Sequence, residues 1–193
     1  MNYINDINNY IPKNEQEAQD KKVILECIRQ FPSTVLLREN EIAHITSSSF
    51  IINQTADKML MIHHNLRNHW TWTGGHADGN GNLLEVAIKE AYEETGIIAK
   101  PLSSKVASVD ICSVYGHVKK GVYVNGHLHL NVAYILIGDE NAALIVKPDE
   151  NSAVEWFPVS AIGIGEGIFG ERDAYLYTKL LQQANIWLRS ANK

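Results

Sequence analysis

Residues 74–97 read GGHADGNGNLLEVAIKEAYEETGI, a glycine-rich loop that leads into a helical pattern. Glycine disfavours a helix, so we predict that the helix begins only after Asn82, which can cap it, with Glu85 three residues later completing a capping box. Gly96 predicts its end, because glycine accepts the left-handed conformation common after helix C-termini. Apolar and small residues between these points recur every three or four positions, which predicts one face packed on a core.

Three glutamates lie beside that face, and they carry the chemistry of the segment. The spacing of Glu90, Glu93 and Glu94 puts them on adjacent turns, where like charges repel by roughly 0.2–0.5 kcal/mol per pair. One interpretation is a solvated acidic face helped by Lys89. The other is a divalent cation, because Mg²⁺ prefers carboxylate and water oxygens and keeps positions open for a substrate phosphate. The adjacent glycine loop favours the cation, since exposed backbone groups offer further contacts to metals and anions.

The segment from Gly75 to Ile97 resembles the Nudix box, G-x5-E-x7-R-E-U-x-E-E-x-G-U, in which U is an aliphatic residue. A pattern of this length with fixed spacing is far more specific than a lone glycine motif. There are two departures from it. Gly81 stands where the pattern has glutamate, and Lys89 stands where it has arginine.

The resemblance implies a fold, an activity and a cofactor. The fold is of the α/β class, a Nudix-type α/β/α sandwich with a mixed β-sheet, and the order of helical and strand-like segments along the chain agrees with it. The activity is hydrolysis of a phosphoanhydride bond in a nucleoside diphosphate linked to another group, with Mg²⁺ or Mn²⁺. Glu90, Glu93 and Glu94 match the family's catalytic and metal-binding carboxylates, and Gly75 matches the glycine whose carbonyl joins them. Family members differ in which carboxylate is the general base, so none is assigned.

The two departures keep other interpretations open. Lys89 lacks the planar fork with which arginine holds two carboxylates, so the glutamates are expected to be less well positioned. Gly81 removes one carboxylate, which weakens activity if that carboxylate served the metal. A Nudix-like module that binds a nucleotide-type ligand without cutting it is therefore the alternative to a hydrolase. An isomerase acting on an allylic diphosphate is disfavoured, because Cys112 falls inside a predicted strand.

Composition limits the class of protein and its partners. The chain has 193 residues, 45% of them hydrophobic and 20% charged, which is ordinary for a soluble protein without a membrane span. A formal net charge of −5 argues against nucleic acid as a partner, so an anionic substrate would need a metal bridge. Cys27 and Cys112 have no paired spacing and fit reduced thiols in the cytoplasm. The N-terminus has neither the basic region nor the apolar run of a signal peptide.

We expect two parts, an N-terminal helical extension over residues 1–43 and a catalytic domain over residues 44–193. The extension starts with an extended lead-in from Tyr3 to Pro12 and continues as a helix over residues 14–31, capped by Asn14. It is expected to pack on the domain, although it could equally form a homodimer. Near the other end, glycines 165, 167 and 170 have the spacing of a dinucleotide-binding fingerprint. No strand leads into them, so we interpret them as a loop before a helix over residues 171–188.

Candidate substrate-binding residues come from the strand-like segments around the glycine loop. Residues 45–52 and 58–63 are predicted to form a hairpin, after which Trp72 could stack on a substrate base or serve the core. His76 follows Gly75 and could contact phosphate. A second hairpin is predicted around the Asn125-Gly126 turn, with His127 and His129 alternating with leucines and so sharing a polar face. That face is either solvated or the wall of a substrate groove, and a zinc site on His127 and His129 would need further ligands.

Overall fold

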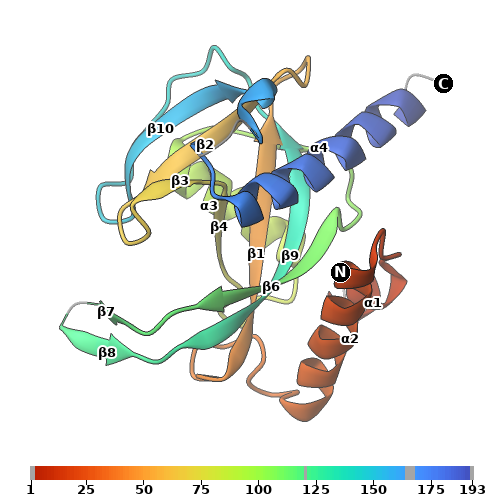
Figure 1. Ribbon diagram of the computed structural model, residues 1–193, viewed down its shortest axis with the longest axis vertical. Coiled ribbons are helices and arrows are strands. Elements are labelled where there is room, and N and C mark those ends of the chain that lie inside the picture. Colours follow the sequence, from red (N-terminus) through yellow and green to blue (C-terminus); the bar gives the residue numbers. More distant parts are fainter. Residues whose placement is uncertain (1–2, 120, 164–167, 192–193) are drawn as a thin grey trace.

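The computed structural model describes residues 3–119, 121–163 and 168–191 (Figure 1). Gly165 and Gly167 lie outside these residues. The strands of the central sheet are β1 (Ala43–Ile52), β2 (Lys58–His64), β3 (His69–Thr71), β4 (Thr73–His76), β5 (Lys100–Pro101), β6 (Ser108–Val114), β9 (His127–Ile137) and β10 (Asn151–Pro158). The helices are α1 (Tyr3–Asn9), α2 (Glu15–Gln30), α3 (Leu83–Thr95) and α4 (Glu171–Ala191), with a 3₁₀ turn η1 (Val159–Ala161).

The sheet of the described residues has eight strands and is mixed. Its main path is β10-β2-β1-β9-β5, with β3 on β2, β4 on β1 and β6 on β9. β1 and β9 run parallel at the centre, whereas β1 and β2 form the predicted antiparallel hairpin. The parallel pair brings together segments that are far apart in the sequence. Its register places His44 opposite His129.

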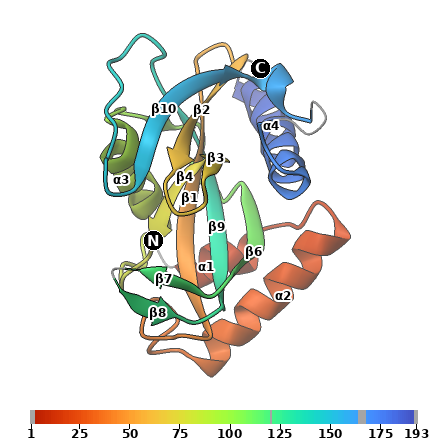
Figure 2. The same ribbon diagram turned by 60° about the vertical axis from the view of Figure 1, so that its left-hand side comes forward.

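Helices cover both faces of the sheet, with α3 on one side and α4 on the other (Figure 2). The alternation of strand side chains explains this arrangement. Ile51 points into the core beneath α3, whereas Phe50 and Ile52 point into the core beneath α4. The predicted α/β/α sandwich with a mixed sheet is confirmed. None of the described helices is both long and apolar enough to cross a membrane.

The N-terminal extension is helical, but it differs from the prediction at its start. Residues 3–9 form α1, so the extended lead-in predicted there is wrong. The reason is burial, since Ile7 is fully buried in the core and the helix of seven residues presents it there. α2 is confirmed, and the side chain of Asn14 accepts a hydrogen bond from the backbone N–H of Glu17 at 2.8 Å.

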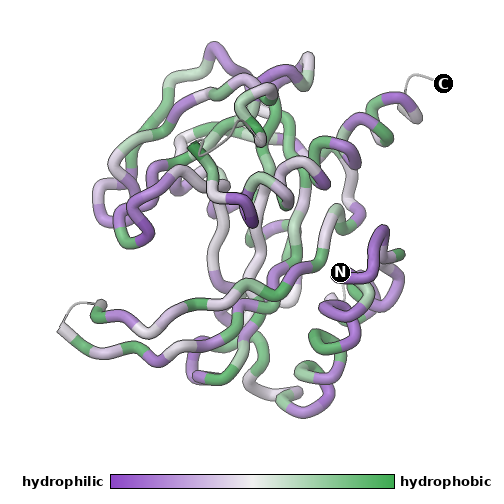
Figure 3. The backbone as a smooth tube through the Cα atoms, viewed as in Figure 1, coloured by the Kyte–Doolittle hydropathy of each residue, from purple (hydrophilic) through white to green (hydrophobic). Residues whose placement is uncertain are grey.

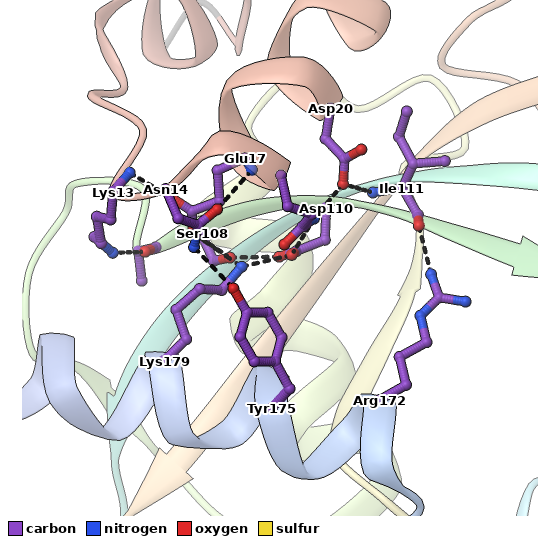
Figure 4. Close-up of polar contacts among 12 residues, drawn as sticks. Lys13, Asn14, Glu17, Asp20, Ser108, Asp110, Ile111, Arg172, Tyr175 and Lys179 are labelled. Atoms are coloured by element: carbon purple, nitrogen blue, oxygen red, sulfur yellow. Dashed lines mark hydrogen bonds and ion pairs between the residues drawn. The ribbon is translucent and has the colours of Figure 1, made fainter.

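A buried polar network ties this extension to its own domain (Figure 4). Glu17 is fully buried, and its carboxylate lies 2.9 Å from the ammonium of Lys179 on α4, which also lies 2.6 Å from Asp110 on β6. The hydroxyl of Tyr10 donates to Glu17 at 2.7 Å. Burial alone would raise the pKa of Glu17, but hydrogen bonds from Tyr10, from the Lys13 amide and from Lys179 hold it below its usual value. The extension therefore packs on the domain through charges that compensate one another.

Helix α3 begins after Asn82 and ends before Gly96 as predicted, but its capping at the N-terminus differs. Gly96 follows it with φ of 76°, and its N–H donates to the carbonyl of Tyr92, as a left-handed C-cap requires. Asn82 is the N-cap residue, yet its side chain makes no capping hydrogen bond. The predicted capping box is wrong, because Glu85 is exposed and the side chain of Asn80 accepts the backbone N–H of Asn82 instead.

The hairpin predicted around Asn125-Gly126 does not form, and a different pair of short strands precedes that position. β7 (His117–Lys119) pairs antiparallel with β8 (Val122–Val124), so the chain reverses between residues 119 and 122. The turn predicted at Asn125-Gly126 is wrong, because these residues only connect β8 to β9, which begins at His127 and pairs with β6 in a register that places His127 opposite Val114. The projecting β7–β8 arm mixes hydrophilic and hydrophobic stretches (Figure 3).

Candidate active site

Gly74 and Gly75 let strand β4 lie close to its partner strand β1 and to helix α3. A Cβ atom at Gly74 would lie 2.9 Å from the backbone oxygen of Ser47, which is too close for any side chain. A Cβ atom at Gly75 would lie 2.6 and 2.7 Å from the two carboxylate oxygens of Glu90. The glycines therefore bring the backbone of β4 directly against a glutamate of the helix.

Glu94 is the most deeply buried of the three predicted carboxylates, with 3% of its surface exposed. Its Oε2 accepts a hydrogen bond from the backbone N–H of Gly74 at 2.9 Å. Burial, together with the negative charges of Glu90 and Glu150, raises the pKa of Glu94 to about 8, and the hydrogen bond from Gly74 opposes this shift. A carboxylate in this position is poorly stabilised by the protein alone.

Glu90 and Glu93 have different surroundings although they share the helix. The Glu90 side chain is 16% exposed, and burial raises its pKa. The Glu93 side chain is 37% exposed and lies 3.0 Å from Lys89 and 3.6 Å from Lys147, and the Lys89 contact lowers its pKa. Lys89 also lies 3.7 Å from Glu90, so this lysine reaches two carboxylates despite lacking the arginine fork.

The donor set suits a hard divalent cation. Glu90 and Glu94 lie one helical turn apart, both are largely buried, and the pKa of each is raised, so a nearby positive charge would stabilise both ionised forms. Carboxylate and carbonyl oxygens are the ligands that Mg²⁺ and Mn²⁺ prefer. These residues fit such an ion, whereas Glu93 is held by lysines on the outer side of the helix.

A cavity of about 190 Å³ opens beside Glu94. Of the predicted substrate residues, Trp72, His76 and His129 line it, and His127 does not. His127 lines an adjoining cavity of about 430 Å³, which shares His76 and His129 with the first. The structure thus brings Glu94, Trp72, His76 and His129 to one cavity, with Glu90 packed behind Gly75.

Three lining residues escaped the sequence analysis or were misjudged there, and a fourth, Asn131, continues the polar face of His127 and His129. Arg67 and Arg172 supply positive charge from the β2–β3 loop and from α4, and no sequence motif marks either. The Nδ2 atom of Asn131 is buried without a hydrogen-bond partner among the described residues, beside the same cavity. Cys112 lies in β6 as predicted, but the inference that a strand position removes it from the site is wrong, because it lines the cavity. Burial raises the pKa of its thiol to about 11, so the thiol is protonated at neutral pH.

The fold and the family of the chain follow from comparison with known proteins. Among solved structures, the chain is similar to a hydrolase of the NUDIX family from Clostridium perfringens, with 20% identity, a TM-score of 0.51, and coverage of 72% of this chain and 96% of that one. It is also similar to a MutT protein from Bacillus halodurans (18% identity, 71% and 81% coverage, TM-score 0.49) and to a C. elegans Ap4A hydrolase (16% identity, 76% and 98% coverage, TM-score 0.46). No curated protein matches the chain. A family model described as NUDIX domain matches residues 43–180, which is well over half of the sequence, and the chain therefore belongs to the Nudix hydrolase family.

Proposed function

We propose that this protein hydrolyses a phosphoanhydride bond in a nucleoside diphosphate linked to another group, with Mg²⁺ or Mn²⁺ as cofactor. The observation that carries the proposal is Glu94, a carboxylate 3% exposed that opens on a cavity containing two arginines. Glu90, Glu94 and the carbonyl of Gly75 are the proposed metal ligands. Glu93 is the outer carboxylate of the set, and its ion pairs with Lys89 and Lys147 must open before it reaches the ion.

The residues that line the cavity have different roles in the proposed reaction. A bound cation supplies neutralisation of phosphate charge and activation of water. Arg67 and Arg172 bind the diphosphate oxygens, because guanidinium groups match phosphate geometry. Trp72 offers an aromatic face to a base, and the Nδ2 atom of Asn131 can donate to a ligand oxygen. The Gly74 N–H fixes the orientation of Glu94 throughout.

The proposed partner is a small anionic molecule, and the proposed location is the cytoplasm. The net charge of −5 is that of the whole chain, whereas Arg67 and Arg172 line the cavity together with Glu94 and Asp173. Two guanidinium groups within one cavity suit a compact anion better than a nucleic-acid backbone. Both cysteines are free thiols, in agreement with a reducing compartment.

Product analysis tests this function. The purified protein is incubated with nucleoside triphosphates, dinucleotides, nucleotide sugars and coenzyme A, with Mg²⁺, with Mn²⁺ and with a chelator. Glu94→Gln keeps the shape of the side chain but removes its charge, and Glu85→Gln is the matched control, since Glu85 is an exposed glutamate on the same helix. We expect metal-dependent cleavage by the native protein and by Glu85→Gln, and its loss in Glu94→Gln.

The opposite outcome identifies the alternative. Gly81 has replaced one carboxylate of the box, and this departure favours a module that binds without cutting. If a compound binds in the presence of metal and no compound is cut, the protein is such a sensor. Cleavage that is equal in Glu94→Gln and Glu85→Gln would contradict the assignment of Glu94.

A further inference from the structure

Three imidazoles meet on the polar side of the two central strands. His44 and His129 are partners in the parallel pairing of β1 and β9, which run side by side (Figure 1). His127 lies two residues before His129 and therefore projects from the same face of β9. One ring nitrogen from each of His44, His127 and His129 lies within 4.8 Å of the other two.

Backbone carbonyls fix the tautomer of two of these rings. The Nδ1 atom of His44 lies 2.9 Å from the carbonyl oxygen of Asn40, and that of His127 lies 2.8 Å from the carbonyl oxygen of Asn125. A carbonyl only accepts, so each Nδ1 carries the proton and each Nε2 is left with a lone pair. Metal-binding histidines in proteins are commonly oriented in this way. The ring nitrogen that does not bind the metal donates a hydrogen bond, which fixes the tautomer.

His44 contributes most to the argument, because its Nε2 atom is buried and makes no hydrogen bond to the described residues. The side chain is 4% exposed, and Nε2 has no hydrogen-bond partner in the described part of the chain. Its ring centroid lies 4.9 Å from that of His127 and 5.1 Å from that of His129. A buried acceptor without a partner costs stability unless something occupies the space in front of it.

We propose that His44, His127 and His129 form a second metal site, separate from the carboxylate centre, that binds Zn²⁺ or a similar divalent transition-metal ion through Nε2. Imidazole nitrogen suits zinc, copper and nickel, whereas Mg²⁺ selects oxygen. With Zn–N bonds of 2.0–2.1 Å, two ligands of a tetrahedral ion lie about 3.3 Å apart. His127 Nε2 and His129 Nε2 lie 3.2 Å apart, so one edge of that tetrahedron is already formed.

A hydrogen bond within the cluster is the alternative to a bound metal. In that arrangement His129 Nε2–H donates to His127 Nε2, but the buried Nε2 of His44 remains without a partner among the described residues.

The position gives the site access to ligands. His129 lines both the cavity beside Glu94 and the adjoining cavity that contains His44 and His127. Three protein ligands leave one position of a four-coordinate ion open, as in sites that bind water or an exogenous ligand. The open coordination position would be taken by an anionic group of a molecule bound in either cavity.

Metal binding by the tag-free chain of 193 residues tests the proposal without reference to activity. Chelator-treated protein is titrated with Zn²⁺ in competition with a chromogenic chelator, in excess Mg²⁺ so that the carboxylates are saturated. The same protein is titrated with Co²⁺, whose visible absorption is much stronger in four-coordinate than in six-coordinate sites. His127→Ala removes a proposed ligand, and His63→Ala is the matched control, because His63 lies on β2, bonded to Ser152 and outside both cavities.

The native protein and His63→Ala are expected to bind one equivalent of Zn²⁺ and to give the strong Co²⁺ spectrum. His127→Ala is expected to bind at least about 100-fold more weakly, since even loss of a supporting partner costs 10–100-fold. The native Co²⁺ spectrum needs no variant and decides the case if His127→Ala does not fold. Absence of Zn²⁺ binding in excess Mg²⁺, a weak six-coordinate Co²⁺ spectrum, or equal affinity in folded His127→Ala would overturn the proposal. Glu94→Gln should keep the Zn²⁺ site, which separates this result from failure of the proposed hydrolase.

Discussion

Replacing Gly75 with alanine should disable the proposed metal centre while leaving the fold intact. The new Cβ would lie 2.4 Å from Cδ of Glu90, and contacts of this kind are ordinary only from 3.4 Å upward, so the carboxylate must retreat by about 1.0 Å. The carboxylate is the free end of a flexible side chain, so the retreat costs little stability. A shift of about 1 Å at a reacting centre can cost on the order of 100-fold in rate. We therefore expect hydrolysis to fall roughly 10- to 100-fold and Mn²⁺ binding to weaken.

The assay compares Gly75→Ala with Gly170→Ala, where an added Cβ meets nothing within 4 Å. Hydrolysis is followed over a range of Mg²⁺ concentrations, Mn²⁺ binding is measured by calorimetry, and thermal unfolding reports on the fold. Gly170→Ala is expected to behave like the native protein in all three. If Gly75→Ala keeps native activity and native Mn²⁺ affinity, the close approach of β4 to Glu90 has no role in the centre and the reasoning is refuted.

Four further predictions concern stability and binding. Lys179→Met leaves Glu17 and Asp110 buried without their cation and should lower the free energy of unfolding by about 3–5 kcal/mol in urea titration, whereas a loss below about 1 kcal/mol would contradict a compensating network. The pKa of Glu17 is depressed in the folded state, so its stabilising effect is present above the pKa of the unfolded chain and lost as pH falls below about 4; native stability should therefore drop there more steeply than that of Glu17→Gln. Arg172→Ala should raise KM about tenfold with kcat nearly unchanged if the guanidinium binds substrate uniformly, and an unchanged KM would remove it from the binding site. Gly96→Ala, at φ of 76°, should cost about 1–2 kcal/mol, and an unaltered melting temperature would contradict a strained C-cap.

The sequence predicted what depends on local pattern and failed where distant strands decide. Helix α3 and its end at Gly96 follow from periodicity and from the conformational freedom of glycine. The Asn125-Gly126 turn is a strong local signal, but the pairing of β6 with β9 overrides it and moves the reversal of the chain. His44 illustrates the same limit, because its partnership with His129 exists only through the parallel register of β1 and β9. No spacing along the chain could have supplied that third ligand for His127 and His129.

The two departures from the Nudix box change residues around the carboxylates. They leave Glu90 and Glu94, the buried carboxylates, in place. At the first departure, a Cβ on Gly81 would meet the Tyr3 ring at 3.3 Å, so α1 packs where the side chain of the missing glutamate would begin. A glutamate at this position would require the Tyr3 ring to shift by a few tenths of an ångström. At the second departure, Lys89 stays within 4 Å of both Glu90 and Glu93, as a point charge on the exposed side. Glu94 contacts neither replacement and is held by the Gly74 N–H instead. The charge and burial on which the proposed chemistry depends are therefore set by β4 and α3, and the N-terminal extension fills the space that the first departure left.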